Sequence, residues 1–115
     1  MFLRTVTSGV VVAVLLSCGC TNPDTAADVA ASPVTHTVTI DASRFEPAML
    51  VVKAGDQVVW TNKDFFPHTA TAGDQRFDSK AIAPGQSWTH TTTDTGTFPY
   101  VCTFHPTMTG TLRVE

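Results

Sequence analysis

The sequence predicts an all-β Greek-key sandwich, and three observations support that prediction. From Thr35 onward, apolar and polar side chains alternate in twos, which is the period of half-buried strands. Turn signals that contain Gly or Pro separate the β-branched runs at short intervals. No stretch of roughly ten residues has apolar side chains at helical spacing. Short strands joined by such turns are typical of a sandwich.

The first expected strand runs from Thr35 to Asp41. His36, Val38 and Ile40 share one of its faces, and threonines occupy the other. This alternation predicts a half-buried strand. It also makes His36 a histidine at the edge of a sheet rather than a metal ligand.

Residues 49–52 and 57–61 are the next two expected strands. Both segments are rich in β-branched or large apolar residues. The segment between them contains Gly55 and Asp56 and is typical of a turn. We expect Met49 to lie in the core.

A further turn is predicted at Pro84 and Gly85, followed by a strand over residues 86–93. Trp88 should point inward from this strand. His90 has the same parity but lies near the end of the strand, so we expect a structural histidine there.

The remaining segments are less regular. Residues 73–83 predict no defined element, although Phe77 is expected to pack over the core. Residues 94–100 resemble the corner of a sandwich, with Tyr100 two residues before a cysteine in the manner of a tyrosine corner. Residues 109–115 should close the domain as a strand.

The front of the chain is typical of a targeting segment and is kept out of the fold. Arg4 precedes an apolar run over residues 10–16, which is too short to cross a bilayer core of roughly 30 Å as a helix. We therefore expect residues 1–17 to be a signal peptide.

The cleavage site is expected to be that of a bacterial lipoprotein. Leu15, Leu16 and Ser17 precede Cys18 as in a lipobox, so Cys18 is the expected lipidation site. Cys20 is a weaker candidate, because Ser17 would then stand where an aliphatic residue is usual. An ordinary secretory signal is the other alternative. We therefore expect a bacterial protein in the periplasm or otherwise outside the cytoplasm, attached to a membrane by the lipid.

Residues 18–34 are expected to be a lipid anchor and a flexible tether. Small and turn-forming residues dominate the segment, and such a composition cannot bury enough surface to order itself. Residues 35–115 then remain as one domain with a modest core.

Charge and cysteine content narrow the possible partners. The 115 residues include ten acidic and seven basic side chains, for a formal charge of -3, without a basic cluster. Nucleic acid is therefore not expected as a partner. We expect the domain to be a monomer. Cys102 is its single cysteine. An unpaired cysteine in an exported protein is a hazard unless something occupies it.

The strongest functional signal is a loop that contains Cys102, His105 and Met108 just before the closing strand. A soft thiolate and a neutral imidazole suit both copper oxidation states, and a weak axial thioether tunes the potential. His68, in the loop that follows the strand over residues 57–61, supplies the fourth expected ligand.

Two stretches carry a resemblance to a known family. The first runs from Trp60 through Asn62 to Pro67 and His68, and the second covers residues 94–108. Together they resemble the cupredoxins, the small blue copper electron carriers, over roughly residues 35–115. The two residues between His105 and Met108 make a short loop like that of the amicyanins. The resemblance implies a single type 1 copper ion and transient redox protein partners as electron donor and acceptor.

Each proposed ligand also has a structural interpretation. Cys102 taken alone is compatible with a small buried apolar residue, His68 with a loop histidine and Met108 with a core residue. Zinc is the competing metal, because Cys and His also bind zinc. Structural zinc sites usually close with four strong ligands, so Met108 favours copper.

The resemblance also implies residues that hold and tune the site. The side-chain amide of Asn62 is expected to tie the first ligand loop to the backbone around Cys102 and to the hydroxyl of Thr103. Asn62 could instead be a turn residue at the end of a strand. The family commonly has proline directly before the second histidine, where this chain has Phe104. We therefore expect the Phe104 N–H to donate toward the sulfur of Cys102.

An apolar docking patch is expected around the two histidines. Phe66, Pro67, Phe104 and Pro106 flank them in sequence, and in the family electrons leave through such a patch. Phe65 is compatible with the patch and with the core.

An enzyme and a copper-delivery or storage protein are the alternatives to an electron carrier. An enzyme would need more histidines and an open coordination position, whereas only His36 and His90 remain, on separate expected strands. We therefore expect no enzyme. A copper-delivery or storage lipoprotein is the closer alternative, although such proteins favour Met-rich or His-rich sites.

Overall fold

The computed structural model describes residues 32–115. The expected signal peptide, the lipidation site Cys18 and most of the expected tether lie outside these residues. Eight strands are present: β1 (Thr35–Asp41), β2 (Arg44–Glu46), β3 (Met49–Val52), β4 (Gln57–Asn62), β5 (Thr71–Ala72), β6 (Ser87–Thr91), β7 (Gly96–Val101) and β8 (Thr109–Val114). Residues 32–115 contain no helix of the length and apolarity that a membrane crossing needs.

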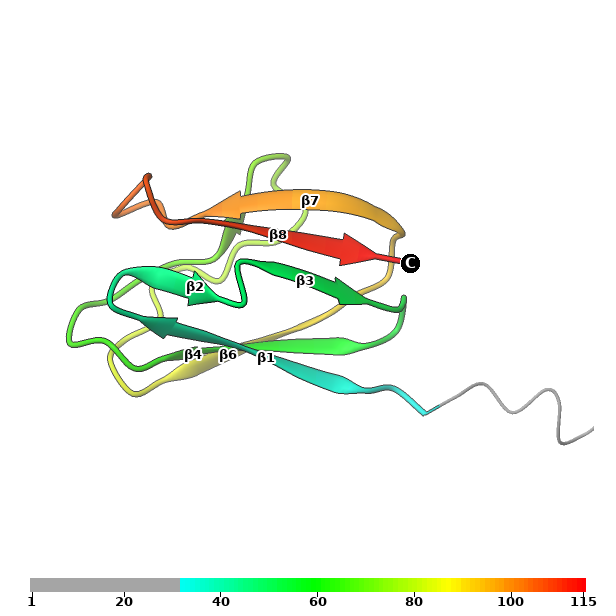
Figure 1. Ribbon diagram of the computed structural model, residues 1–115, viewed down its shortest axis with the longest axis horizontal. Helices are drawn as coiled ribbons and strands as arrows, with labels where there is room; N and C mark the ends of the chain where they lie inside the picture. The colour runs from blue at the N-terminus through cyan, green and yellow to red at the C-terminus, as the bar shows by residue number, and fades with distance from the viewer. Residues whose placement is uncertain (1–31) are drawn as a thin grey trace, which may run out of the picture. The chain divides into compact units, whose positions relative to one another are not determined.

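The strands form two four-stranded sheets that pack face to face (Figure 1). One sheet has the order β2-β1-β4-β6 and the other β3-β8-β7-β5. β1 runs parallel to β4 and β3 parallel to β8, while the other pairs are antiparallel. Consecutive strands repeatedly change sheet. The predicted all-β sandwich is confirmed.

The period-two pattern explains why the expected strands form. In β1, Val38 and Ile40 are buried while the neighbouring threonines are exposed or half-buried, as predicted. The same alternation in β3 overturns one expectation, because Met49 is 64% exposed and not part of the core. Met49 and Val51 share the outer face of β3, whereas Val52 faces the core.

The core lies between the sheets and is centred on Trp60. Its indole packs against Tyr100, Phe77 and Trp88, each with a ring-centroid distance of 5.5 Å. Phe77, expected to cover the core, is buried there. His90 stacks on Trp88, which agrees with the structural role expected for it.

The prediction of a corner over residues 94–100 is largely wrong, because residues 96–100 belong to the strand β7. Tyr100 points into the core, and its hydroxyl has no hydrogen-bond partner among the residues described, so it forms no tyrosine corner. Burial raises the pKa of Tyr100 to about 12. The ring lies over Gly110 of β8, where a Cβ atom would overlap it.

Two short strands, β2 and β5, were not predicted, because two or three residues carry too little pattern to identify. Residues 73–83, for which no element was expected, fold back along the chain segment after His68. Isolated bridges pair His68 with Ile82 and Thr71 with Asp78. This segment therefore forms one wall of the region that contains the predicted ligands.

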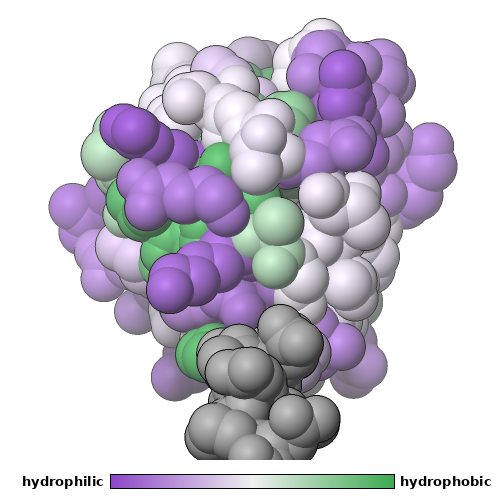
Figure 2. Space-filling view, turned by 90° about the vertical axis from the view of Figure 1, so that its right-hand side faces the viewer, coloured by the Kyte–Doolittle hydropathy of each residue, from purple (hydrophilic) through white to green (hydrophobic). Residues whose placement is uncertain are grey.

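The predicted ligands lie at one end of the sandwich. His68 follows β4, and Cys102 follows β7, so the loops that carry them meet at the end drawn on the left in Figure 1. Figure 2 shows the opposite end, where hydrophilic and neutral residues cover most of the surface and hydrophobic ones show only in small areas.

Candidate metal centre

The first ligand loop is held in place by Asn62, the last residue of β4. Its side-chain nitrogen donates to the carbonyl oxygens of Phe66 (2.8 Å) and Ile82 (2.9 Å), and its side-chain oxygen accepts from the Asp64 N–H (2.9 Å). Backbone bonds in both directions join His68 and Ile82. Because Asn62 is fully buried, water does not compete for these bonds, and they hold the loop in place.

Asp64 fixes the ring of His68. Nε2 of His68 lies 2.8 Å from Asp64 Oδ2, and the same carboxylate accepts from the N–H groups of Ala42 and Ser43. Burial opposes ionisation of Asp64, but these donors outweigh it and hold the pKa of the carboxyl below its usual value. An ionised carboxylate can only accept, so Nε2 of His68 is the donor in this contact and Nδ1 is the ring nitrogen left to face Cys102.

The second ligand loop closes on itself through its backbone. Cys102 donates its N–H to the carbonyl of Met108 (3.0 Å), His105 donates to Cys102 (3.2 Å), and Met108 donates to His105 (2.8 Å). These three backbone bonds close the loop that carries the expected ligands. Met108 is buried, at 3% exposure.

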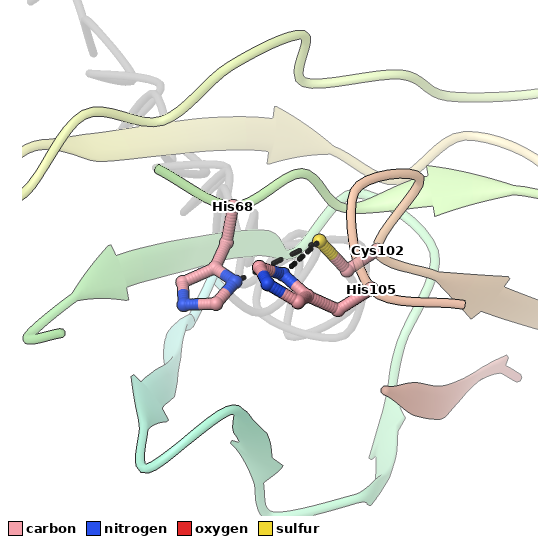
Figure 3. Close-up of side chains that lie close together, drawn as sticks. All are labelled: His68, Cys102 and His105. Atoms are coloured by element: carbon pink, nitrogen blue, oxygen red, sulfur yellow. Dashed lines mark hydrogen bonds between the residues drawn. The ribbon is translucent and has the colours of Figure 1, made fainter. Parts of the chain in front are cut away.

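Three donor atoms converge where the two loops meet (Figure 3). Cys102 Sγ lies 3.7 Å from Nδ1 of His68 and 3.9 Å from Nδ1 of His105. A metal ion in the plane of the three donors, at the bond lengths of zinc sites, would separate sulfur from each nitrogen by roughly 3.7 Å. The cluster of His68, Cys102 and His105 therefore fits a trigonal metal ion.

Burial differs among these donors. Cys102 and His68 are fully buried, whereas His105 is exposed. The Cys102 sulfur and the His68 ring are thus shielded from water, and the His105 ring faces solvent. In the described part of the chain, this is the one group of at least three His, Cys, Asp or Glu side chains that could hold a metal ion. His36 lies outside it, paired with Asp56.

Thr69 links the two ligand loops. Its backbone N–H donates to Cys102 Sγ at 3.3 Å, and its hydroxyl oxygen accepts from the Thr103 N–H at 2.9 Å. The hydroxyl groups of Thr69 and Thr103 are 3.1 Å apart. These contacts join the residues that directly follow His68 and Cys102.

Two expectations about the surroundings of the site are corrected by this arrangement. Asn62 does not reach the backbone around Cys102 or the hydroxyl of Thr103, because its amide is used by Phe66 and Ile82. Thr69 makes the contact to Thr103 instead. Within residues 32–115, the backbone N–H that donates to the sulfur is that of Thr69, and no bond from the Phe104 N–H is present.

The residues expected to form an apolar patch are at the surface. Phe66 is 65% exposed, Phe104 is 52% exposed, and both Pro67 and Pro106 are exposed. Phe65 is 92% exposed, so its assignment to the core is excluded. The ring centroids of His68 and His105 are 5.1 Å apart, with the exposed ring of His105 on the solvent side.

The sequence interpretation missed Asp64 and Thr69. An acidic residue four positions before a proposed histidine ligand was a usable signal for Asp64, because metal-bound histidines usually donate their second N–H to a carboxylate or carbonyl. Thr69 had a weaker signal. It is a hydroxyl residue next to one ligand, and its partner Thr103 is next to another.

Comparison with known proteins agrees with this geometry. A protein-family model described as a cupredoxin-like domain matches residues 8–114. Amicyanin from Paracoccus denitrificans is 33% identical over 99 residues, which cover 82% of this chain and 74% of the relative. Chloroplastic plastocyanin from Tetradesmus obliquus is 35% identical over 77 residues, which cover 53% of this chain and 50% of the plastocyanin.

Solved structures give the same result. A copper(I) form of an amicyanin mutant superposes with a TM-score of 0.65 and 34% identity, over 78% of this chain and 89% of the other. A copper-containing nitrite reductase from Thermus scotoductus SA-01 superposes with a TM-score of 0.68 and 28% identity. In that case 75% of this chain is covered but only 23% of the reductase chain.

Proposed function

Because this chain belongs to the cupredoxin family, we propose that it is a one-electron carrier that works outside the cytoplasm with a single type 1 copper ion. The observation that carries the proposal is the convergence of Nδ1 of His68, Sγ of Cys102 and Nδ1 of His105 within 4.8 Å of one another. A thiolate with two imidazoles is the donor set of a blue copper site.

The proposed ligands are His68, Cys102 and His105, with Met108 as a weak fourth donor. A copper ion held there would supply the copper(II)/copper(I) couple, and hence one electron per cycle. Met108 is buried in the same hydrogen-bonded loop, which suits a thioether that stays close to the other donors.

The task of the protein is to keep these donors in one place in both oxidation states. Asp64 holds the His68 ring, the backbone bonds of residues 102–108 hold the second loop, and Asn62 supports the first loop. Side chains that do not need to rearrange lower the energy that each electron transfer requires. Because Cys102 is fully buried, water does not reach its sulfur.

Electrons would enter and leave through the exposed ring of His105. Exposed apolar surface surrounds the site and suits brief docking of redox protein partners. It is formed by Phe66, Pro67, Phe104 and Pro106. Phe65 belongs to the same docking patch, because 92% of it is exposed.

An enzyme is disfavoured despite the similarity to a nitrite reductase. This chain covers 23% of the reductase chain, so it corresponds to a fraction of that protein. Within residues 32–115, no second cluster of potential metal ligands exists beside His68, Cys102 and His105. Copper delivery or storage is the alternative, and the full burial of His68 and Cys102 favours retention of the ion over exchange.

We place the protein on the outer side of a bacterial membrane. The proposal is that residues 1–17 are removed, Cys18 carries lipid and residues 18–34 tether the domain. The sequence around Leu15, Leu16, Ser17 and Cys18 supports it, and Cys20 remains the alternative lipidation site.

The absorption spectrum of the copper(II) form tests the central proposal. A short bond between copper and a thiolate gives an intense band in the red part of the visible spectrum, so the protein should be blue. Cys102→Ser should abolish the band, while His36→Ala, a change outside the cluster, should leave it intact. Stoichiometric copper(II) in a colourless protein would overturn the carrier and favour storage or delivery.

A further inference from the structure

A row of hydroxyl groups connects the candidate metal centre to a carboxylate in the segment of residues 73–83. Thr71 Oγ1 lies 3.1 Å from Thr69 Oγ1 and also 3.1 Å from Asp78 Oδ1. Thr69 Oγ1 in turn accepts from the Thr103 N–H and contacts the Thr103 hydroxyl. Thr69 and Thr71 are buried, so water does not replace these contacts. None of these bonds involves a proposed ligand directly.

Asp78 is held at the outer end of this row. Its Oδ1 accepts from the Lys80 N–H and its Oδ2 from the Lys80 ammonium, both at 2.9 Å. The Lys80 N–H is the main cause that lowers the pKa of Asp78, and the Lys80 ammonium follows. The carboxylate is therefore ionised at neutral pH and can only accept hydrogen bonds. A bridge between Thr71 and Asp78 fixes their separation.

The hydroxyl of Thr71 has one proton and two acceptors to choose from. Its oxygen is placed to donate to Asp78 and to Thr69 at equal distances. Hydrogen bonds to a charged acceptor are roughly twice as strong as those to a neutral one, so the proton points to Asp78. Thr69 Oγ1 then has two lone pairs for two donors, the N–H and the hydroxyl of Thr103.

We propose that Asp78 is a positioning residue for Cys102. By holding the proton of Thr71, it leaves Thr69 Oγ1 free to bind Thr103, the residue that follows Cys102. Without the carboxylate, the proton of Thr71 turns to Thr69 and competes with the donors of Thr103. The effect on reduction potential rests on the proposed copper function, whereas the effect on the hydrogen bonds does not.

Asp78 should influence the electronic state of the sulfur through this row. Thr69 uses its side chain to hold Thr103 and its N–H to donate to Cys102 Sγ at 3.3 Å. If the side-chain contacts loosen, the N–H moves away from the sulfur. A hydrogen bond to the thiolate withdraws electron density and favours the reduced metal, so its weakening lowers the potential.

The first experiment uses the copper-free protein and amide hydrogen exchange. In Asp78→Ala, the Thr103 amide should exchange about fivefold faster than in the wild type, the factor expected for a hydrogen bond of ordinary strength. Asp74→Ala is the matched control, because the exposed Asp74 is on the same segment but contacts Arg76 and no threonine. It should leave the Thr103 exchange rate unchanged.

A second substitution separates this account from simple damage to the segment. Thr71→Val removes the competing proton, so Thr69 keeps both donors of Thr103 whether or not Asp78 is present. The double variant Asp78→Ala with Thr71→Val should therefore restore slow exchange at Thr103. Exchange that stays fast in the double variant would refute the proposal, because a merely structural role of Asp78 would not be rescued.

The sign of the change in reduction potential is the last test, on the copper-loaded protein. Loss of a negative charge acting through space would raise the potential, whereas loosening the bond to the sulfur should lower it. We expect Asp78→Ala to lower the potential and Thr71→Val to cancel that change. A rise of equal size in both backgrounds would overturn the proposal. A colourless protein with slow, Asp78-dependent exchange would instead refute the copper function alone.

Discussion

At the level of single residues, the orientation of His68 depends on Asp64. The carboxylate receives three donors: the N–H groups of Ala42 and Ser43 and the His68 ring. The two backbone donors come from the turn after β1, so the carboxylate is fixed before any metal arrives. The ring it holds therefore presents Nδ1, and not Nε2, to Cys102.

Asp64→Ala should weaken copper binding about 10- to 100-fold, which is the usual effect of removing a partner of a histidine ligand. Without the carboxylate, the imidazole can rotate or change tautomer, and part of the population no longer offers Nδ1. Competition with a chelator of known affinity measures the loss. Asp41→Ala is the control, because the side chain of the exposed Asp41 makes no hydrogen bond within residues 32–115. Equal affinities of both variants would contradict the role given to Asp64.

At the level of elements, the pairing of β7 with β8 depends on a residue without a side chain. Tyr100 lies opposite Gly110 in the register of these strands, and its ring occupies the space above the glycine. The fully buried ring contacts Phe45 and Trp60 at centroid distances of 4.7 Å and 5.5 Å. It therefore has little room to move when the strand opposite changes.

Gly110→Ala should destabilise the fold by about 1 to 3 kcal/mol, the range for overpacking a core. The new methyl group would overlap the Tyr100 ring, which must shift into its neighbours or push the strands apart. Denaturant unfolding of the copper-free protein measures the loss. Gly73→Ala is the matched control, because its Cβ would meet nothing closer than the Pro99 oxygen at 4.0 Å. A loss at position 110 no larger than at position 73 would show that Tyr100 adapts freely.

A second element-level contact joins the start of β1 to the turn between β3 and β4. The Asp56 carboxylate accepts from the Val34 N–H, lies 2.9 Å from His36 Nε2 and accepts from the Lys53 N–H. The Val34 N–H is the largest of these influences, and together they lower the pKa of Asp56 to about 2. The hold of the Asp56 carboxylate on the start of β1 therefore depends on its ionisation.

The stability that Asp56 contributes should depend on pH in a defined direction. Its folded pKa is depressed, so the contribution is complete above the unfolded value of about 4 and is lost as the pH falls toward 2. The difference in unfolding free energy between the wild type and Asp56→Asn should therefore shrink over that interval. Asp41→Asn serves as the control in the same titration. A difference that stays constant from pH 5 to 2 would disprove the linkage.

The sequence predicted those parts of the fold that depend on local pattern. Strands such as β1 and β4 alternate clearly, and Cys102, His105 and Met108 stand close together in the chain. Contacts that depend on tertiary position were beyond it. Met49 could not be assigned to the outer face of β3. The contact to Thr103 was assigned to Asn62 from the family resemblance, whereas Thr69 makes it. Spacing identifies candidate ligands, but not the residues that orient them.

At the level of the whole molecule, the front of the chain supports the proposed attachment to a membrane. We propose lipid on Cys18, because buried acyl chains contribute about 0.8 kcal/mol per CH₂ group and hold a protein to a bilayer. The domain that the structure describes begins at residue 32. Val34 already donates to Asp56, and its carbonyl accepts from Gln57.

Cys18→Ala should move the protein from the membrane fraction to the soluble extracytoplasmic fraction. Cys20→Ala, a substitution two residues away, should leave it in the membrane fraction and is therefore the control. Fractionation followed by detection of the protein measures both. Retention of the first variant with release of the second would assign the lipid to Cys20, and release of neither would exclude a lipid anchor at these cysteines.

The direction of β1 separates the start of the described domain from the candidate metal centre. β1 starts at the end of the sandwich drawn on the right in Figure 1 and finishes beside the loop of His68, where the Lys63 N–H donates to the carbonyl of Ile40. Seven extended residues make the strand about 20 Å long. A redox partner that docks over His105, as proposed, would therefore contact the end of the domain opposite to Thr35.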